Sequence, residues 1–427
     1  MVLLNDLLDF PNAIANKAIS KGYFEKVDDN LKNLLKKDSI SPKPLLVCSG
    51  GTTTRCAADG HWTIDLRKNY NHLKFDRTDS TIEIGAGLTM GRLAAELAKE
   101  KRSFPIGLSG ITGLGYILTG GISPLSRSQG LAIDNVLGFK GIWGNGNYFE
   151  IKKPAKFATK KEKIEWKSLC GASPFLAIIT SIKAKTFDLE KLIVWQGSVS
   201  PIQLSKAINH AEKWVTSASL QWIWDEEIKL YVVIKADDME ASRDLSYLIK
   251  SLSLDSNQEI INISGIHQLP EFSSSKKNPL QKQYYYETIS LLSPVWGEST
   301  NNIIDKIKYL MKEKPSPGCC IAAQQLGGKT SLIDSNETSF IYRESIWKPW
   351  ITATWDFNNE SSKKASLNWL NQSWSALQPS CQGVHLAQMH PHLPWHKKEI
   401  EYAYGNWLAG LKRVKSYCDP NGILPSL

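Results

Sequence analysis

The chain has 427 residues, of which 42% are hydrophobic and 22% charged, so it has the composition of a folded globular protein and the length of two domains. Its net charge of +9 would suit an anionic substrate but does not indicate nucleic-acid binding, because seven lysines gather in one solvated connecting segment, 152–167, and no DNA- or RNA-binding signature is present. No apolar run is long enough to cross a bilayer, so no membrane span is expected.

The first 40 residues are polar and helical in pattern, most clearly in VDDNLKNLLKK, residues 27–37. They begin with acidic residues and lack a basic region before an apolar core, which is unlike a secretory signal. The seven cysteines are scattered, apart from the adjacent Cys319 and Cys320, and are expected to be reduced thiols. We therefore expect a cytoplasmic protein.

Short strands dominate the segment from residue 42 to residue 152. The strand-like runs are PLLVC, WTIDL, TIEIGA, VLGFKGIW and YFEI. An Asn145-Gly146 step between the last two runs predicts a hairpin. Thr89 stands where it can cap a helix that runs through LTMGRLAAELAKEKR. This half of the chain is therefore expected to mix strands and helices.

Two glycine-containing segments interrupt these elements: CSGGTTTR, residues 48–55, and PIGLSGITGLGYILTGGISPLSRSQGLAIDNV, residues 105–136, with seven glycines. Glycine permits positive φ and close approach of a ligand, and successive backbone N–H groups form anion-binding concavities. A dinucleotide pyrophosphate would fit such a site, although tight turns in a β-rich domain have a similar composition. GITGLG is not a Rossmann fingerprint, because the strand–turn–helix frame and the acidic residue about 20 positions later are missing.

A second mixed unit begins near residue 190. Its strand-like runs are KLIVWQGSV, LYVVIKA, CCIAAQQL and WITATWDF, and its helical patterns lie near 203–216 and 240–252 and in NNIIDKIKYLMKEK. The chain ends in one more amphipathic helix, EIEYAYGNWLAGLKRVKSYCDP. Together the two units predict an α+β protein.

The order of these segments resembles the FAD-binding domain of the vanillyl-alcohol-oxidase and p-cresol-methylhydroxylase (PCMH) superfamily. The resemblance is greatest to the berberine-bridge-enzyme-like and 6-hydroxynicotine-oxidase-like branch. It rests on the strand before SGG, the segment ending SRSQGLAIDNVLG, CGASPFLAIIT, QQLGGKTSLIDSNETSFIYR and the tail YAYGNWLAGLKRVKSYCDPNGIL. It covers residues 42–190 and 400–425 well and 320–355 moderately, whereas 190–320 match only in layout.

The resemblance implies a two-domain PCMH-type fold. Residues 1–190, with a core of about 42–187, would form the FAD-binding domain. Residues 191–385 would form a substrate domain of antiparallel sheet plus helices. Residues 386–427 would return to the FAD-binding domain as a C-terminal segment.

The resemblance also assigns cofactor-binding residues. Asp134 would fix loop geometry, and Ile179 would lie on the adenine side. Thr52 and Ser109 stand where many relatives have a histidine and a cysteine joined covalently to the flavin, so non-covalent FAD is expected. In the tail, Asn406 comes one position earlier than in relatives. The full set is Ser49, Gly50, Gly51, Thr52, Thr53, Gly107, Ser109, Thr112, Gly113, Gly120, Gly121, Ile179 and Asn406.

The implied activity is an FAD-dependent oxidoreductase that removes a hydride from a small alcohol, sugar or amine, with oxygen or an unknown compound as electron acceptor. The protein would supply a base, a role that tyrosines serve in the family. The catalytic candidates are Tyr285, Tyr342 and Arg343. Tyr284 and Tyr286 adjoin Tyr285, and neighbouring strand residues face opposite ways, so at most two of the three can face the flavin. Packed strand residues are the alternative interpretation.

The segment GVHLAQMHPHLPWH holds four of the eight histidines. Two prolines and the lack of a nearby acidic or cysteine ligand argue against a metal site. One histidine could line the cleft or act as a base, or all four could have packing and surface roles. Because the usual flavin linkers are absent, a degenerate, non-catalytic flavoprotein-fold binding protein is the alternative function. A reductase of a nucleotide-sugar intermediate is less expected, since its substrate domain should not carry GGK…FIYR.

Overall fold

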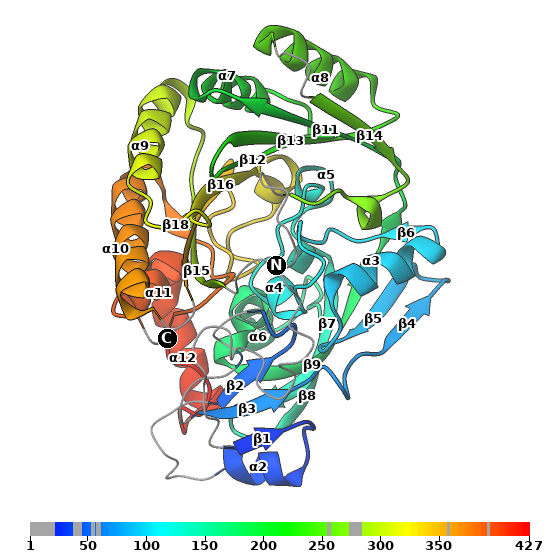
Figure 1. The fold of residues 1–427 in the computed structure, drawn as a ribbon. Helices are drawn as coiled ribbons and strands as arrows, with labels where there is room; N and C mark the ends of the chain where they lie inside the picture. The colour runs from blue at the N-terminus through cyan, green and yellow to red at the C-terminus, as the bar shows by residue number, and fades with distance from the viewer. Residues whose placement is uncertain are drawn as a thin grey trace.

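A computed structural model describes residues 22–36, 45–52, 56, 61–253, 258–272, 284–356, 359–390 and 393–427. Two sheets organise this part of the chain: a five-stranded sheet in the order β4-β5-β9-β7-β8 and an eight-stranded sheet in the order β14-β11-β13-β12-β16-β17-β15-β18. Figure 1 shows the smaller sheet beside α3 and α6, and the larger sheet lined by α7, α9 and α10. The fold is α+β, as predicted.

The N-terminal half contains the smaller sheet and a minor parallel sheet, β1-β3-β2. The predicted hairpin joins β7 to β8, with Gly146 at φ +83°. Thr89 occupies the N-cap of α3 but makes no side-chain cap hydrogen bond. The elements are β1 (Gly22–Phe24), α2 (Asp29–Leu35), β2 (Leu45–Cys48), β3 (Trp62–Asp65), β4 (Leu73–Asp76), β5 (Thr81–Gly85), α3 (Met90–Lys99), β6 (Arg102–Ser103), α4 (Gly115–Leu118), α5 (Ser126–Gln129), β7 (Val136–Trp143), β8 (Tyr148–Lys152), α6 (Lys160–Ala172) and β9 (Ala177–Lys185).

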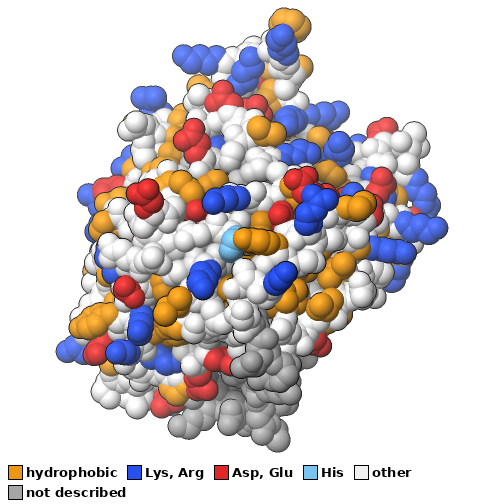
Figure 2. Space-filling model, turned by 90° about the horizontal axis from the view of Figure 1, so that it is seen from above, with side chains coloured by type: hydrophobic (Ala, Val, Ile, Leu, Met, Phe, Trp, Pro, Cys, Tyr) orange, Lys and Arg blue, Asp and Glu red, His pale blue; other side chains and the backbone are white. Residues whose placement is uncertain are grey.

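The lysine-rich segment 152–167 is not only a connecting segment, because helix α6 begins within it. A capping box at Thr159 and Glu162 starts α6 there, and both of its reciprocal hydrogen bonds form. On the face shown in Figure 2, Lys and Arg side chains are scattered among acidic and apolar ones rather than gathered in one patch.

The C-terminal half forms the large sheet and its helices. Helix α10 was not predicted, and Gly405, at φ +43°, divides the predicted C-terminal helix into α11 and α12. The elements are β10 (Phe187–Asp188), β11 (Leu192–Val199), α7 (Pro201–Ala211), β12 (Ala218–Trp224), β13 (Ile228–Lys235), α8 (Met239–Leu252), β14 (Gln258–Ile263), β15 (Tyr284–Leu292), α9 (Thr300–Lys312), β16 (Cys320–Gln325), β17 (Trp347–Asp356), α10 (Glu360–Leu377), β18 (Gly383–Val384), α11 (His396–Tyr404) and α12 (Leu408–Cys418).

The two faces of the large sheet differ in chemistry. Directly opposed residues of antiparallel strands share a face. One face carries Ile321, opposite Ile351, and also Trp347, whose indole N–H donates to Glu212 beyond the end of α7 at 2.8 Å. This is the apolar face that the helices cover. The opposite face carries Gln324 opposite Lys348.

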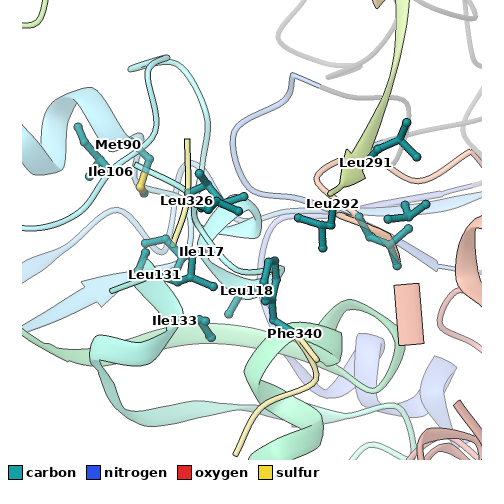
Figure 3. Close-up of a cluster of buried hydrophobic side chains, with 14 of the residues drawn as sticks. Met90, Ile106, Ile117, Leu118, Leu131, Ile133, Leu291, Leu292, Leu326 and Phe340 are labelled. Atoms are coloured by element: carbon teal, nitrogen blue, oxygen red, sulfur yellow. The ribbon is translucent and has the colours of Figure 1, made fainter. Parts of the chain in front are cut away.

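The polar face of the large sheet lies towards the N-terminal half. Leu326, two residues beyond Gln324 and therefore on the same face, packs among Met90, Ile117 and Leu131 of that half (Figure 3). The guanidinium of Arg127, from α5, fixes this contact by donating to the carbonyl oxygen of Leu326 at 2.7 Å. The glycine-rich segment and the polar face therefore meet at the contact between the two halves.

The C-terminal segment packs against the N-terminal half. Helix α12 contacts α6, and Lys415 Nζ donates to the carbonyl oxygen of Phe175 at 2.8 Å. The amide of Asn145, in the β7–β8 turn, donates to the carbonyl oxygen of Tyr417 at 3.0 Å. Among the helices of the described ranges, none has the length and apolar character needed to span a membrane.

Candidate FAD-binding site

The loop that follows β2 is fixed against the glycine-rich segment. Ser49 Oγ donates to the carbonyl oxygen of Ala86 and accepts from the N–H of Gly115 at 3.4 Å. A Cβ atom on Gly50 would lie 2.4 Å from the backbone nitrogen of Gly113, so only glycine allows this approach. Gly51 has φ +72°, a left-handed conformation that also favours glycine.

This loop presents backbone donors that nothing in the described ranges uses. The N–H groups of Gly50, Gly51 and Thr52 form no hydrogen bond there, and all three residues are half-buried. Successive free N–H groups at a left-handed turn are an anion-binding arrangement. The loop therefore fits a phosphate group of a dinucleotide. Thr53, also predicted to bind the cofactor, lies outside the described residues.

The glycine-rich segment places its glycines at close contacts. Gly120 and Gly121 have φ +136° and +72°. A Cβ on Gly120 would lie 3.1 Å from the Phe340 ring and 3.2 Å from His385 Nε2, and one on Gly107 would lie 2.9 Å from the Tyr116 ring. Side-chain bulk is thus excluded at Gly120, where the segment faces Phe340 and His385 of the C-terminal half, and at Gly107, where the segment packs against its own Tyr116.

The two residues expected near the flavin linkage differ in setting. Ser109 is exposed, and its carbonyl oxygen accepts from Thr112 Oγ1 at 3.0 Å. The carbonyl oxygen of Thr52 accepts from the hydroxyl of Tyr286 on β15. This hydrogen bond connects the loop that follows β2 to the polar face of the large sheet.

An interdomain pocket opens beside Gly120. Its empty space is about 250 Å³, including the solvent at its mouth. Phe340 lies beside Leu118 there (Figure 3), and its ring and that of His385 are 5.8 Å apart. His385 Nε2 lies 3.1 Å from the carbonyl oxygen of Thr119. The pocket draws its lining from three parts of the chain, including Thr119, Leu292, Phe340, Tyr342, His385 and Tyr404.

Tyr342 and Arg343 are sequence neighbours with different surroundings. Tyr342 is half-buried in the pocket lining, and burial raises its pKa. The Arg343 guanidinium is buried instead against Asp134, with nitrogen–oxygen distances of 3.0 and 2.8 Å, and also donates to Thr338 Oγ1. Asp134 in turn accepts from the N–H of Leu131 at 2.9 Å. The structure therefore uses Arg343 as a tie between the halves and does not direct it into the pocket.

The tyrosines of β15 point in opposite directions, as strand geometry predicts. Tyr285 is opposite Trp355, on the face that the helices cover, and their rings are 6.1 Å apart. Tyr286 points to the N-terminal half and reaches Thr52. Burial raises the pKa of Tyr286 well above its ordinary value. Tyr286, rather than the predicted Tyr285, is thus the tyrosine of this strand that faces the cofactor loops.

Two further predicted cofactor residues lie apart from the pocket. Ile179 is buried in β9, opposite Gly141 of β7. Asn406 is exposed in the turn between α11 and α12, while Tyr404 lines the pocket two residues before it. The structure does not bring the Asn406 side chain to the pocket.

The histidine segment separates into two environments. His385 lines the pocket, whereas His390 is fully buried between two glutamates. His390 Nδ1 lies 2.9 Å from Glu399, and its Nε2 lies 3.3 Å from Glu287. Burial alone would lower the pKa of His390, but the two carboxylates outweigh it and raise the pKa to about 10. His390 is therefore held as a cation inside the fold. His392 lies outside the described residues.

Comparison with known proteins identifies the cofactor domain. Residues 28–152 match the family model described as an FAD binding domain. The chain is 22% identical over 421 residues to an uncharacterized FAD-linked oxidoreductase, YvdP, of Bacillus subtilis, covering 92% of this chain and 88% of that protein. It is 22% identical to a carbohydrate oxidase of Microdochium nivale, covering 85% and 77%. Over 34% of this chain and 31% of the relative, it is 28% identical to (R)-6-hydroxynicotine oxidase of Paenarthrobacter nicotinovorans.

Solved structures share the fold over nearly the whole chain. Berberine bridge enzyme from Eschscholzia californica superposes with a TM-score of 0.76 at 19% identity, covering 100% of this chain and 95% of that one. A chitooligosaccharide oxidase superposes with a TM-score of 0.79 at 16% identity, covering 98% and 93%. The predicted resemblance is confirmed: the fold is that of the berberine-bridge-like flavoproteins, and residues 28–152 match an FAD binding domain.

Proposed function

We propose that this chain is an FAD-linked oxidoreductase that oxidises a small alcohol, sugar or amine and holds its FAD without a covalent bond. The observation that carries the proposal is the loop at Gly50, Gly51 and Thr52. Its N–H groups form no hydrogen bond within the described ranges and lie beside the glycine-rich segment, near the polar face of the large sheet. When bound, FAD supplies the hydride acceptor, and the protein supplies orientation, proton transfer and exclusion of water.

The residues at the usual linkage positions support non-covalent binding. Thr52 and Ser109 carry hydroxyl groups, and within the described ranges neither hydroxyl forms a hydrogen bond that would make its oxygen a nucleophile. The N–H groups of Gly50 and Gly51 would hold the pyrophosphate, and Gly120 and Gly121 would allow the flavin to approach the backbone.

The interdomain pocket would receive the substrate. Tyr342 and His385 line it and are two lining groups able to exchange a proton with a substrate hydroxyl or amine. Because burial raises the pKa of Tyr342, its phenol remains protonated at neutral pH and can donate a hydrogen bond. The substrate classes follow from the relatives: one is named a carbohydrate oxidase and another a hydroxynicotine oxidase.

We further propose that the protein acts in the cytoplasm, with oxygen or another small oxidant as electron acceptor. The seven cysteines all lie within the described residues and form no disulfide there, which suits a reducing compartment.

An absorbance spectrum before and after acid precipitation tests the proposal. A yellow protein whose FAD all appears in the supernatant, and whose flavin is bleached by sugars, alcohols or amines, is the expected result. Flavin that remains in the pellet would overturn non-covalent binding. A colourless protein that takes up no added FAD would overturn the oxidoreductase activity itself.

A further inference from the structure

A row of four polar side chains crosses the face of the large sheet that looks towards the N-terminal half. Tyr231 is in register with Gln221, Gln221 with Gln324, and Gln324 with Lys348. We call these four residues the polar row. The register of β15 with β17 places Leu292 opposite Lys348, and Leu292 lines the interdomain pocket. The polar row therefore ends one strand away from a residue of the pocket wall.

Lys348 is a buried lysine with no acidic partner among the described residues. It is 6% exposed, and no acidic side chain of the described ranges forms an ion pair with it. Its amino group lies 4.5 Å from the centre of the Trp350 ring. Burial lowers the pKa of Lys348 to about 7. Keeping a lysine there costs free energy that an anion at the same place would offset.

The glutamines of the row also have unused hydrogen-bonding capacity. Gln324 Nε2 and Gln221 Oε1 are buried and have no hydrogen-bond partner in the described part of the chain. Gln221 uses its other end to donate to Ser219 Oγ at 3.0 Å. Buried polar atoms are nearly always paired, so an unused donor directly opposite Lys348 points to a ligand between them.

The other polar and charged groups around the polar row indicate that a ligand there would carry one negative charge. Tyr231 donates its hydroxyl to the carbonyl oxygen of Pro270 at 3.0 Å. Arg127, the cation at the end of the same strands, donates to four backbone carbonyl oxygens. Glu259, the nearest acid along the register, is exposed on β14, two strands beyond Tyr231. Lys348 is thus the one cation available to a ligand among the described residues of this face.

We infer that a small monocarboxylate substrate binds at the polar row, beside the interdomain pocket, with its two carboxylate oxygens accepting hydrogen bonds from Lys348 Nζ and Gln324 Nε2. The inference rests on the proposed function and narrows its substrate to a hydroxy acid, an uronic acid or an amino acid. A phosphate dianion fits less well, because a single cation faces it. The net charge of +9 suits the capture of such an anion.

Calorimetry on the FAD-loaded protein tests the inference with acid–amide pairs of one shape: lactate and lactamide, glucuronate and glucuronamide, benzoate and benzamide. At least one acid is expected to bind about tenfold or more tightly than its amide. At pH 8 its binding should take up as much as about 0.9 proton, because Lys348 is largely neutral before binding and cationic after it.

Two variants identify the groups responsible. K348M is expected to abolish both the acid preference and the proton uptake, whereas K312M, which removes an exposed lysine of α9, leaves both unchanged. If K348M does not fold, Q324M serves instead and should weaken acid binding several-fold. No preferred acid in the panel, or a preference that survives in K348M, would overturn the carboxylate site. If neutral sugars or amines still bleach the flavin, the proposed function stands without it.

Discussion

Replacing Gly50 by alanine tests whether the loop after β2 holds the cofactor. The new Cβ would lie 2.4 Å from Gly113 N, 3.0 Å from Gly113 Cα and 3.1 Å from the carbonyl oxygen of Ile111. All three are backbone atoms, so no flexible side chain can move aside. The loop itself must shift, and its N–H groups shift with it.

The expected loss follows from the hydrogen bonds that this shift breaks. A hydrogen bond to a charged group contributes about 1.5–3 kcal/mol, so displacing one or two N–H groups from a phosphate should cost about 3 kcal/mol. That corresponds to roughly a hundredfold weaker FAD binding. Overpacking should also lower the free energy of unfolding by about 1–3 kcal/mol.

Titration of apoprotein with FAD, followed by flavin fluorescence, measures the effect, and chemical unfolding measures the stability loss. Gly115→Ala is the matched control, because a Cβ on Gly115 meets nothing within 4 Å. FAD binding should remain near wild type in this control. If Gly50→Ala bound FAD as tightly as wild type while its unfolding free energy fell, the loop would be structural and the phosphate assignment wrong.

Three further predictions concern the ties around the site. Asp134→Asn leaves the Arg343 guanidinium buried without its counter-charge and should lower the free energy of unfolding by about 3–5 kcal/mol. The double variant Asp134→Asn/Arg343→Met should regain part of this stability. Equal losses in the single and double variants would contradict the assignment. Tyr286→Phe removes the bond to the Thr52 carbonyl and should weaken FAD binding several-fold while leaving β15 folded by circular dichroism; unchanged affinity would show that this bond does not position the loop. The pKa of His390 is raised from its ordinary 6.5 to about 10, so its stabilising contribution is complete below about pH 6.5 and is lost as the pH rises through 10; urea unfolding from pH 6 to 10 should show this decline in wild type but not in His390→Gln.

Local sequence chemistry predicted the parts of the site that are made of backbone. The loop at Gly50 and Gly51 and the turn at Gly120 and Gly121 could be recognised because glycine marks positive φ and close backbone approach. The hairpin at Asn145-Gly146 followed from the same reasoning. These features depend on a few neighbouring residues, which is the range over which single-sequence reasoning works best.

Side-chain partners depend on strand register, which the sequence does not give. The three consecutive tyrosines at 284–286 predict side chains that alternate between the two faces of a strand. They do not predict which tyrosine faces inward, because a register shift of one residue exchanges the two faces. Arg343 follows Tyr342 directly, yet its partner, Asp134, lies 209 residues away. The signal for Lys348 was a lysine between tryptophans in WKPW, a charge inside an apolar strand. That pattern marks an unusual position but does not reveal the glutamines opposite it.

The two buried cations of the domain contact show how a structural tie and a binding site can be told apart. Arg127 gives its guanidinium to the carbonyl oxygens of Ala218, Leu326 and Trp214 at 2.7–2.8 Å, so burial is compensated within the chain. Lys348 lies on the neighbouring strand β17, close to the same contact. Within the described part of the chain, the one interaction of its amino group is with the Trp350 ring. A cation whose donors are all used stabilises the fold whether or not a ligand is present. A buried basic group that the described chain leaves uncompensated lowers the stability of the free protein, and the protein regains that stability when an anion binds. This difference in compensation assigns Lys348, and not Arg127, to the substrate.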